Sequence, residues 1–513
     1  MEGFTPWPKE FADTYRDAGY WLGKTISEVM DESFSRYASR TALITDDGRH
    51  FTYEELGRLI TRLALHLNAL GLNTYDRLIL QMPNSAEVVI TYLATLKAGV
   101  IPIMALAAHR EAEIGYFAQL SEARALAVAG SFRGFDFQEM AAAVQAVNPQ
   151  LALVLVTGDE PREGYHSIDA FLKDPIEERV QPEVLPRPDP HLPAVLLLSG
   201  GTTGIPKLIP RTHNDYVYNF LRNAEICELD ENTVLYALEL IQKHRVTHFV
   251  GVPTMILGLL NHPARDQYDL SSLKCILTGG SKLNPEVALR IRPELGCEVQ
   301  QVLGMAEGPL YWNRLGEPDE VNLHTQGRGQ SPADEFRIVD PDTGKEVPEG
   351  EVGELWCRGP HTIRGYYRAP EHNAGAFTED GFYKSGDLVR LHPSGNVVVE
   401  GRIKDCINRG GEKISAEEVE DHILAHPDVD NCAYVAMPDH LLGERACAYI
   451  TMKPGMKITL ALLNEFLLNQ RKIAKYKLPE RLELIDAFPL TAVGKINKQV
   501  LRDMISTKLQ EER

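Results

Sequence analysis

A glycine- and threonine-rich stretch carries the clearest chemical signal in the chain. It follows the apolar run Ala194–Leu198, which predicts a buried strand, and Asn214-Asp215 beyond it are typical of a helix start. Glycine lets the backbone approach an anion and turn several N–H groups toward it, while threonine hydroxyls and a lysine add donors and a cation. It is not a Walker A loop, because a proline precedes its lysine. The pattern predicts a phosphate-binding loop formed by Ser199, Gly200, Gly201, Thr202, Thr203, Gly204 and Lys207.

Further segments place useful groups directly after predicted strands or turns. Thr278-Gly-Gly-Ser281 follows a short apolar strand and is typical of backbone that passes close to a flat ligand. Glu307, in Gly304-Met-Ala-Glu-Gly308, offers the hard carboxylate oxygen that Mg²⁺ prefers. Asp387 follows a tight turn and could accept two hydrogen bonds from a sugar diol. Each residue alone could equally be an ordinary turn-former or helix cap, so the order of the segments carries the argument.

Two segments near the C-terminus add lysines beside glycines. Gly401-Arg-Ile-Lys-Asp-Cys-Ile-Asn-Arg-Gly-Gly411 contains Lys404, and Pro489-Leu-Thr-Ala-Val-Gly-Lys495 ends in a lysine on a predicted loop. Without its context, a loop lysine such as Lys495 is usually only a solvated charge.

Composition excludes several classes of protein. A chain of 513 residues is too long to fold around a single hydrophobic core, so we expect at least two domains. A formal charge of −19 argues against nucleic-acid or anionic-membrane partners. Seven scattered cysteines without a CxxC pair are typical of a reducing compartment and exclude a cysteine-rich zinc site or disulfide framework. With no secretory signal and no apolar run of membrane-spanning length, we expect a cytoplasmic protein.

Alternating helix and strand patterns in the first half predict a layered α/β domain with largely parallel strands. The patterns include a helix over 26–38, a strand over 41–45, a helix opened by the capping box Thr52-x-x-Glu55, and a strand over 78–81. From about 321 to 401, short strands separated by Gly/Pro turns predict a small β subdomain. We therefore expect an N-terminal domain over residues 1–402.

The pattern changes again after Arg402. A helix capped at Ser415, strands over 431–436 and 445–452, a helix over 460–471 and a strand over 481–485 predict a compact α+β module over residues 403–513. The expected fold is thus a large α/β domain with a β subdomain, followed by a small, mobile α+β lid domain.

In this order and spacing, the segments resemble the adenylate-forming superfamily of acyl- and aryl-CoA synthetases, adenylation domains and luciferases. The resemblance covers nearly the whole chain. Within that superfamily, the chain more closely resembles the stand-alone aryl-acid–AMP ligases of siderophore synthesis. These ligases activate 2,3-dihydroxybenzoate or salicylate and load it on an aryl carrier protein. This closer resemblance is carried by Trp7-Pro-x-Glu-Phe-Ala, Gly19-Tyr-Trp, Pro210-Arg-Thr-His-Asn-Asp-Tyr216, Arg364-Gly-Tyr-Tyr and Asn408-Arg-Gly-Gly-Glu-Lys413.

The resemblance implies roles for individual residues. Lys495 would bridge the substrate carboxylate and phosphate oxygens, and Lys404 matches the hinge about which the lid rotates; these are the catalytic candidates. ATP would bind the phosphate loop, Asp387, Arg402, and an adenine site flanked by Gly280 and Val302, with Mg²⁺ at Glu307. Gly304, Ala306 and Lys413 would contact the acid, and Gly410 and Gly411 would guide the phosphopantetheine thiol of the carrier protein.

One region departs from the aryl-acid ligases. Residues 231–237 predict a strand, 238–244 a helix and 247–252 the next strand, where those ligases have some tens of additional residues. The absent residues carry a His-Asn pair and a serine, of which the Asn and the serine contact the acid. Two further departures, Pro309-Leu-Tyr-Trp312 and Gly329-Gln-Ser331, lie near the expected acid pocket. The nucleotide half of the site is intact, whereas the acid half is incomplete.

Three interpretations follow. The first is an aryl-acid–AMP ligase that passes its product to a carrier-protein thiol. The second is a CoA ligase for another carboxylic acid. The third is a catalytically impaired nucleotide- or carrier-binding protein, which the missing segment favours. The sequence does not rank salicylate against dihydroxybenzoate, because the discriminating positions lie where the chain departs.

Overall fold

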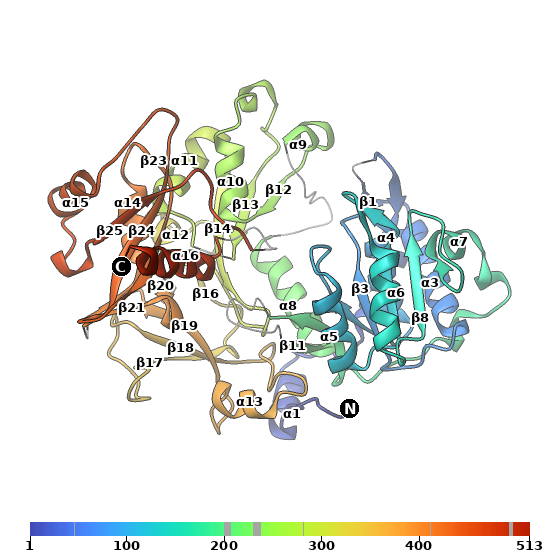
Figure 1. Cartoon of the computed structure of the whole chain (residues 1–513). Helices are drawn as coiled ribbons and strands as arrows, with labels where there is room; N and C mark the ends of the chain where they lie inside the picture. The colour runs from blue at the N-terminus through green and yellow to red at the C-terminus, as the bar shows by residue number, and fades with distance from the viewer. Residues whose placement is uncertain are drawn as a thin grey trace.

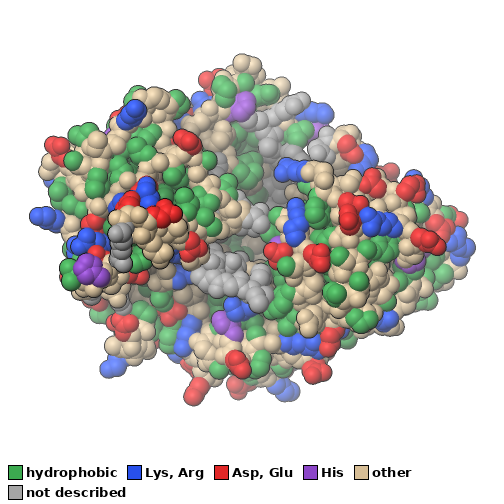
Figure 2. All heavy atoms as spheres, viewed as in Figure 1, with side chains coloured by type: hydrophobic (Ala, Val, Ile, Leu, Met, Phe, Trp, Pro, Cys, Tyr) green, Lys and Arg blue, Asp and Glu red, His purple; other side chains and the backbone are tan. Residues whose placement is uncertain are grey.

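The structure is a computed structural model that describes residues 1–45, 47–199, 207–228, 238–280, 282–410, 412–491 and 496–512, with only the backbone at 238, 239, 254 and 413. Among these residues, no helix is both long and apolar enough to cross a lipid bilayer. Figure 1 shows the elements, and Figure 2 shows that this face is hollowed between the part built on the first large sheet and the remainder.

The first large sheet has the strand order β11-β10-β4-β3-β5-β8-β9 among the described residues. Its strands are parallel except for the antiparallel hairpin of β10 and β11. Its bounds are β3 Arg77–Gln81, β4 Ile101–Met104, β5 Ala125–Ala129, β8 Leu153–Thr157, β9 His166–Ser167, β10 Pro193–Leu198 and β11 Leu208–Thr212.

Helices cover both faces of this sheet. Alternate residues of each strand point to opposite faces, so each strand contributes side chains to two cores. Leu78 and Leu80 pack in one core with Leu63 and Ile90, whereas Ile79 packs in the other with Phe117. The helices and small strands of this part are α1 Lys9–Asp17, α2 Ile26–Arg36, β1 Thr41–Ile44, β2 His50–Thr52, α3 Tyr53–Ala69, α4 Ala86–Lys97, α5 Glu111–Ser121, β6 Ser131–Phe132, β7 Phe135–Asp136, α6 Phe137–Val147, α7 Ile168–Lys173 and α8 His213–Ile226. The expected capping box at Thr52 and Glu55 is present.

The second sheet has the order β12-β13-β14-β15-β16, with β12–β14 parallel and the last two pairings antiparallel. Its elements are α9 Leu238–His244, β12 His248–Gly251, α10 Pro253–Leu260, β13 Cys275–Gly279, α11 Pro285–Leu295, β14 Glu298–Gly304, β15 Leu310–Trp312, α12 Asp319–His324 and β16 Arg328–Gly329. Both the helix expected over 238–244 and the strand that follows it are therefore present. The strand expected over 231–237 lies outside the described residues.

The third sheet is antiparallel and comprises β17 Glu335–Val339, β18 Gly353–Arg358, β19 Tyr383–Leu391 and β20 Val397–Arg402, with α13 Pro370–Ala376 beside it. We expected the β subdomain from about residue 321, but its sheet begins at Glu335, since the short strand β16 at 328–329 pairs with the second sheet. Residues 319–324 instead form α12, because Val321 is buried and Leu323 packs against the core of the second sheet.

The C-terminal part is a small α+β unit, as expected. Its elements are β21 Ile407–Arg409, β22 Glu412–Ile414, α14 Ala416–Leu424, β23 Val429–Asp439, β24 Gly443–Met452, α15 Leu460–Asn469, β25 Arg481–Leu484 and α16 Lys498–Glu511. Alternate residues of β23 face two cores: Tyr434 packs with α14 and α15, and Val435 packs with α16. Short 3-10 helices lie at Ile176–Glu178, Pro182–Val184, Arg265–Gln267, Ile403–Asp405 and Lys475–Lys477.

Candidate nucleotide and acid site

The two ends of the predicted phosphate loop are joined. The backbone N–H of Ser199 donates to the Lys207 carbonyl at 2.9 Å, and the Lys207 N–H donates to Ser199 Oγ at 2.9 Å. These bonds close the base of the β10–β11 hairpin and fix where the loop leaves the sheet. Gly200, Gly201, Thr202, Thr203 and Gly204 lie outside the described residues.

Glu307 lies close to the base of that loop. Its side chain is buried, and its Oε1 accepts a hydrogen bond of 2.7 Å from the Tyr366 hydroxyl. The Lys207 ammonium lies 5.8 Å from the centroid of the Tyr366 ring. The Tyr366 hydroxyl is also 3.1 Å from that of Tyr383, at the start of β19. Tyr366 thus links the cation of the predicted phosphate loop to the predicted metal ligand.

Asp387 and Arg402 face one another across β19 and β20. They are register partners, and Arg402 Nε lies 2.6 Å from Asp387 Oδ1. Burial raises the pKa of Asp387 against the opposing effect of Arg402, and the charge on Glu307 adds to the rise. Glu307 is linked through Tyr366 to Tyr383 at the start of β19, and Asp387 lies on the same strand.

The predicted adenine site is formed by a close approach of two strands. Gly279 and Val302 are register partners in β13 and β14, and a Cβ on Gly279 would lie 2.4 Å from Val302 Cγ1. Gly280, next in the chain, has φ +88°, a conformation that favours glycine. Backbone without side chains therefore lies beside Val302, as contact with a flat ring requires.

The C-terminal candidates are only partly described. Lys404 lies on the 3-10 helix directly after β20, within electrostatic range of Asp387. Gly410 has φ +59°, and its N–H donates to the Leu442 carbonyl at 2.9 Å. Gly411, Lys495 and the side chain of Lys413 lie outside the described residues.

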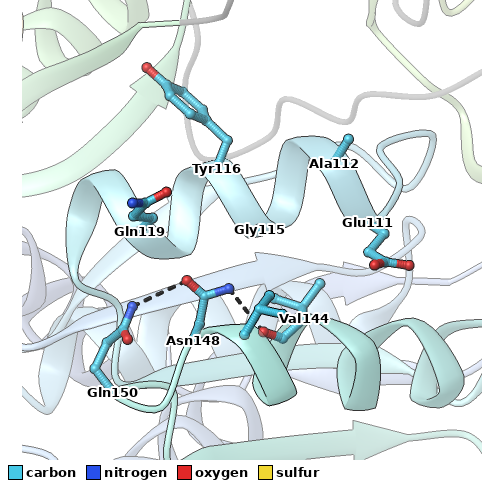
Figure 3. A pocket seen from close by; sticks show the side chains of 9 residues that line it. Glu111, Ala112, Gly115, Tyr116, Gln119, Val144, Asn148 and Gln150 are labelled. Atoms are coloured by element: carbon cyan, nitrogen blue, oxygen red, sulfur yellow. Dashed lines mark hydrogen bonds between the residues drawn. The ribbon is translucent and has the colours of Figure 1, made fainter.

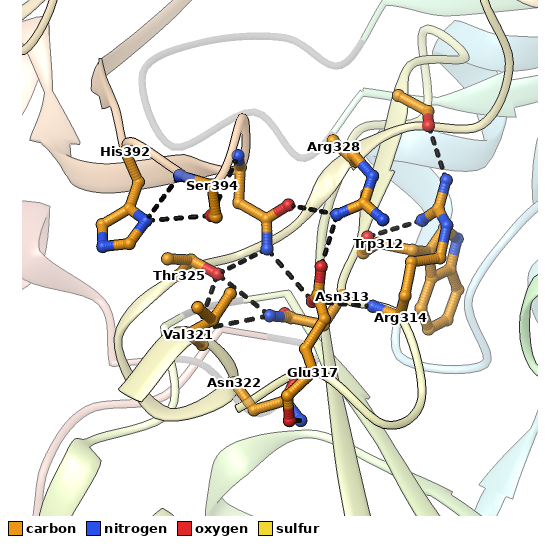
Figure 4. A network of polar contacts seen from close by, with 12 residues as sticks. Trp312, Asn313, Arg314, Glu317, Val321, Asn322, Thr325, Arg328, His392 and Ser394 are labelled. Carbon is orange, nitrogen blue, oxygen red and sulfur yellow. Dashed lines mark hydrogen bonds and ion pairs between the residues drawn. The ribbon is translucent and has the colours of Figure 1, made fainter. Parts of the chain in front are cut away.

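The two departures near the expected acid pocket contact α8. Trp312 Nε1 and Gln330 Nε2 both donate to Asn223 Oδ1, at 2.9 and 2.5 Å. Arg314 donates to the carbonyls of Trp312 and Gly329, and Arg328 donates to Asn396 Oδ1 (Figure 4). These residues form a rigid polar junction between β15, β16 and α8. Gly304 and Ala306, the predicted acid contacts, lie at the end of β14 and just beyond it.

The donor set at Glu307 fits Mg²⁺. No group of three or more His, Cys, Asp or Glu side chains among the described residues could hold a metal by itself. Mg²⁺ commonly uses one or two carboxylates together with substrate phosphates rather than an all-protein cage. A single buried carboxylate beside the phosphate-loop lysine supplies that combination.

A cavity lies away from these residues. It measures about 650 Å³ and is formed between α5 and α6, where Tyr116, Val144 and Gln150 line it (Figure 3). None of the predicted site residues contributes to it.

Three residues of the site received no role from the sequence: Tyr366, Arg211 and Asn219. Tyr366 belongs to the Arg364-Gly-Tyr-Tyr segment, but nothing in that pattern pairs it with Glu307. Arg211 lies on β11 and Asp215 in the first turn of α8, so the rule for ion pairs within one helix does not predict their contact. No pattern in the sequence indicated a role for Asn219.

Comparison with known proteins agrees with this fold, which is that of an adenylate-forming enzyme. The model of the AMP-binding enzyme family matches residues 30–237 and 221–367, and that of its C-terminal domain matches 418–495. The chain belongs to the AMP-binding enzyme family and is an ATP-dependent adenylate-forming ligase. The first model matches in two pieces that overlap at 221–237, just before the position after Ala237 where we expected residues to be missing.

Curated relatives align end to end. The chain is 41% identical to the 2,3-dihydroxybenzoate-AMP ligase of Bacillus subtilis, over 99% of both chains. It is 42% identical to a salicylyl-CoA synthase / salicylate adenylyltransferase of a Streptomyces species, over 99% of this chain and 98% of that one. The first alignment runs over 546 positions, more than the 513 residues of this chain, so the relative carries residues that this chain lacks.

Solved structures share the fold over nearly the whole chain. The apo structure of Mycobacterium smegmatis MbtA is 38% identical and superposes with a TM-score of 0.71 over 98% of both chains. MatB from Rhodopseudomonas palustris, 25% identical over 93% of this chain and 98% of its own, superposes with a TM-score of 0.82 when ATP is bound and 0.72 in its apo form.

Proposed function

We propose that this enzyme activates an aromatic carboxylic acid, 2,3-dihydroxybenzoate or salicylate, as the aryl-adenylate. It then transfers the aryl group to the phosphopantetheine thiol of an aryl carrier protein in siderophore biosynthesis. The observation that carries the proposal is the 41% identity to a 2,3-dihydroxybenzoate-AMP ligase along the full length of both chains. We further propose that it acts in the cytoplasm, with no nucleic-acid or membrane partner.

The reaction has two steps. A carboxylate oxygen of the acid attacks the α-phosphorus of ATP, and the bond to the bridging oxygen breaks to release pyrophosphate. The thiol then attacks the aryl carbonyl, loses its proton and displaces AMP. Because negative charge gathers on phosphate oxygens in the first step, cations and N–H groups aimed at them lower the barrier.

Each predicted residue has a place in this scheme. The loop Ser199–Lys207 holds the β- and γ-phosphates, Asp387 and Arg402 hold the ribose, and Gly280 and Val302 flank the adenine. Bound at Glu307, Mg²⁺ would neutralise phosphate charge. Ala306, Gly304 and Lys413 lie against the acid, and Lys495 bridges the reacting carboxylate and phosphate.

The second step needs a different face of the lid domain. We propose that residues 403–513 rotate about Lys404 relative to residues 1–402. This rotation withdraws Lys495 and brings Gly410 and Gly411 to the thiol channel. The position of Lys404, directly after the last strand of the third sheet, supports a hinge there. Lys404→Pro should spare adenylate formation and block thioester formation.

ATP–pyrophosphate exchange over a panel of benzoates tests the proposal. We expect exchange with 2,3-dihydroxybenzoate or salicylate, and loss of that exchange in Lys495→Ala. Activity of Lys495→Ala equal to wild type would contradict the catalytic assignment.

Two alternatives have specific support. The Streptomyces relative is named both a CoA synthase and an adenylyltransferase, which supports CoA as the acceptor; release of aryl-CoA instead of aryl-carrier thioester would select it. The residues missing near 221–237 support a catalytically impaired nucleotide- or carrier-binding protein. ATP binding without exchange for every acid tested would select this third function.

A further inference from the structure

The segment that carries Glu307 is held by its backbone carbonyls. The Ala306 carbonyl accepts a hydrogen bond from Arg211 Nη1 at 3.1 Å, and the Glu307 carbonyl accepts one from the Ile363 N–H at 2.9 Å. The Gly308 carbonyl accepts one from Asn219 Nδ2 at 3.3 Å. Three consecutive carbonyls therefore have donors from outside the segment, and two of these donors are side chains.

Arg211 is itself oriented by a buried partner. Its side chain is 3% exposed, and Nε lies 2.6 Å from Oδ1 of Asp215, which is 0% exposed. The other oxygen of Asp215 accepts from the backbone N–H and the hydroxyl of Thr212, at 2.6 and 2.8 Å. A buried ion pair contributes little net stability because both charges lose water, so stability alone is a weak reason for placing one here. Its fixed geometry determines where Nη1 meets Ala306.

Arg211 and Asn219 also connect two parts of the site along the chain. Arg211 lies near the end of β11, which begins at Leu208 directly after the phosphate-loop lysine, and Asn219 lies on the helix that follows. β11 is an edge strand of the first sheet, and Figure 1 shows β11 and α8 on the side of that sheet that faces the rest of the molecule. The strand and helix that leave the phosphate loop are thus the ones that hold the Glu307 segment.

We propose that Arg211 and Asn219 are positioning residues for Glu307. By holding the carbonyls of Ala306 and Gly308, they fix the backbone on either side of Glu307 and so determine where its carboxylate meets the metal bound to ATP. Tyr366 fixes the same carboxylate from the side-chain end. This inference rests on the proposed function, in which Glu307 is the Mg²⁺ ligand.

The test uses Asn219→Ala, which removes the donor to Gly308, and Arg211→Lys, whose single ammonium cannot bridge Asp215 and Ala306 as a guanidinium does. Arg222→Gln is the matched control, since Arg222 lies on the same helix but pairs with Glu225 at the surface. In ATP–pyrophosphate exchange, we expect Asn219→Ala and Arg211→Lys to raise the Mg²⁺ concentration for half-maximal rate by about tenfold, equivalent to ~1.4 kcal/mol. The KM for the acid should change by less than about threefold, or ~0.7 kcal/mol.

Two further measurements separate positioning from general destabilisation. Mn²⁺ binding to the enzyme–ATP complex, followed by electron paramagnetic resonance, should weaken by a similar factor in both variants and stay unchanged in Arg222→Gln. In a Glu307→Gln background, Asn219→Ala and Arg211→Lys should have no further effect on Mn²⁺ binding, because a residue acting through Glu307 has nothing left to position.

An unchanged metal requirement with a lowered melting temperature would overturn the proposal, as would effects that add to those of Glu307→Gln. Should Arg211→Lys fail to fold, Asn219→Ala decides the matter alone. Failure of the wild-type enzyme to exchange pyrophosphate with any acid would contradict the proposed function. The Mn²⁺ measurement with ATP would still decide whether Arg211 and Asn219 position Glu307.

Discussion

Gly308, beside the site, has a conformation and surroundings that leave little room for any other residue. Its φ is +123°, and a Cβ there would lie 1.7 Å from the His361 carbonyl oxygen. We expect Gly308→Ala to lower the free energy of unfolding by about 3 kcal/mol, because backbone strain and steric overlap add. Gly316→Ala is the control: its φ is +77° with no atom within 4 Å, so only the strain of about 1 kcal/mol applies. Equal losses in urea denaturation would show that the overlap relaxes at no cost.

Asp334 links stability to pH. Its side chain is 4% exposed, and burial raises its pKa to about 7, against an ordinary value of 3.8. Between these values the folded protein binds more protons than the unfolded chain. This contribution to stability is therefore greatest at low pH and declines as pH rises toward 7. Burial lowers the pKa of the neighbouring His361 to about 3, so this histidine stays neutral across that range.

Asp334→Asn should remove this dependence. We expect the difference in unfolding free energy between wild type and variant to change by about 1 kcal/mol per pH unit across the window below 7, and to be constant above it. Urea denaturation at several pH values measures the difference. A constant difference throughout would show that Asp334 titrates at its ordinary pKa.

At the scale of elements, α14 is joined to the third sheet through Ser415, the N-cap residue that precedes the helix. Ser415 Oγ accepts a 3.3 Å hydrogen bond from the Glu418 N–H and donates to the Glu400 carbonyl on β20. Thr459 caps α15 in the same way, accepting from the Leu462 N–H at 3.3 Å. Both Ser415→Ala and Thr459→Ala should cost about 1 kcal/mol of stability, as lost helix caps usually do.

Only Ser415→Ala should alter the balance between the two half-reactions, because only Ser415 bonds to the sheet that precedes the proposed hinge. The ratio of pyrophosphate exchange to thioester formation, measured for both variants, tests this. The same ratio in Thr459→Ala and Ser415→Ala would mean that the α14–β20 contact does not influence lid rotation.

Elements with strong local signals were predictable, and those shaped by distant contacts were not. The strand over 78–81 and the capped helix beginning at residue 53 agree with the sequence pattern, because alternation and capping are local. The helix α12 was missed because Leu323 packs, partly buried, against the core of the second sheet rather than against neighbours in sequence. At the site, Gly279, next to the predicted Gly280, is the strand partner of Val302, and Asp387 is the strand partner of Arg402. Tyr366 with Glu307 required contacts between segments far apart in the chain.

At the scale of the whole molecule, an ion pair connects the second sheet's part to the C-terminal unit. Lys282 Nζ lies 2.9 Å from Asp421 Oδ2 on α14. Burial opposes the charge on Lys282, but Asp421, Glu400 and Glu417 outweigh it and raise its pKa. The chain superposes better on ATP-bound MatB than on apo MatB, with TM-scores of 0.82 and 0.72. We expect this ion pair to hold the second sheet's part against the C-terminal unit in the arrangement seen in this structure.

Charge reversal tests that expectation. Lys282→Glu and Asp421→Lys should each slow adenylate formation by about fivefold, or ~1 kcal/mol, and the double variant should recover most of the loss. The radius of gyration from X-ray scattering with ATP should rise in the single variants and return in the double. Additive losses in the double variant would show that the pair does not hold the two parts together.

The sequence by itself determined the fold class, the family and the order of the nucleotide-binding segments. Strand alternation, helix caps and glycine-rich turns depend on residues that are neighbours in the sequence. Tertiary structure alone decided that Tyr366, Arg211 and Asn219 hold Glu307 and the residues on either side of it, and that Trp312 and Gln330 meet Asn223 on α8. The physical reason is that a buried polar group needs a partner, and which partner reaches it depends on how strands and helices distant in sequence pack together.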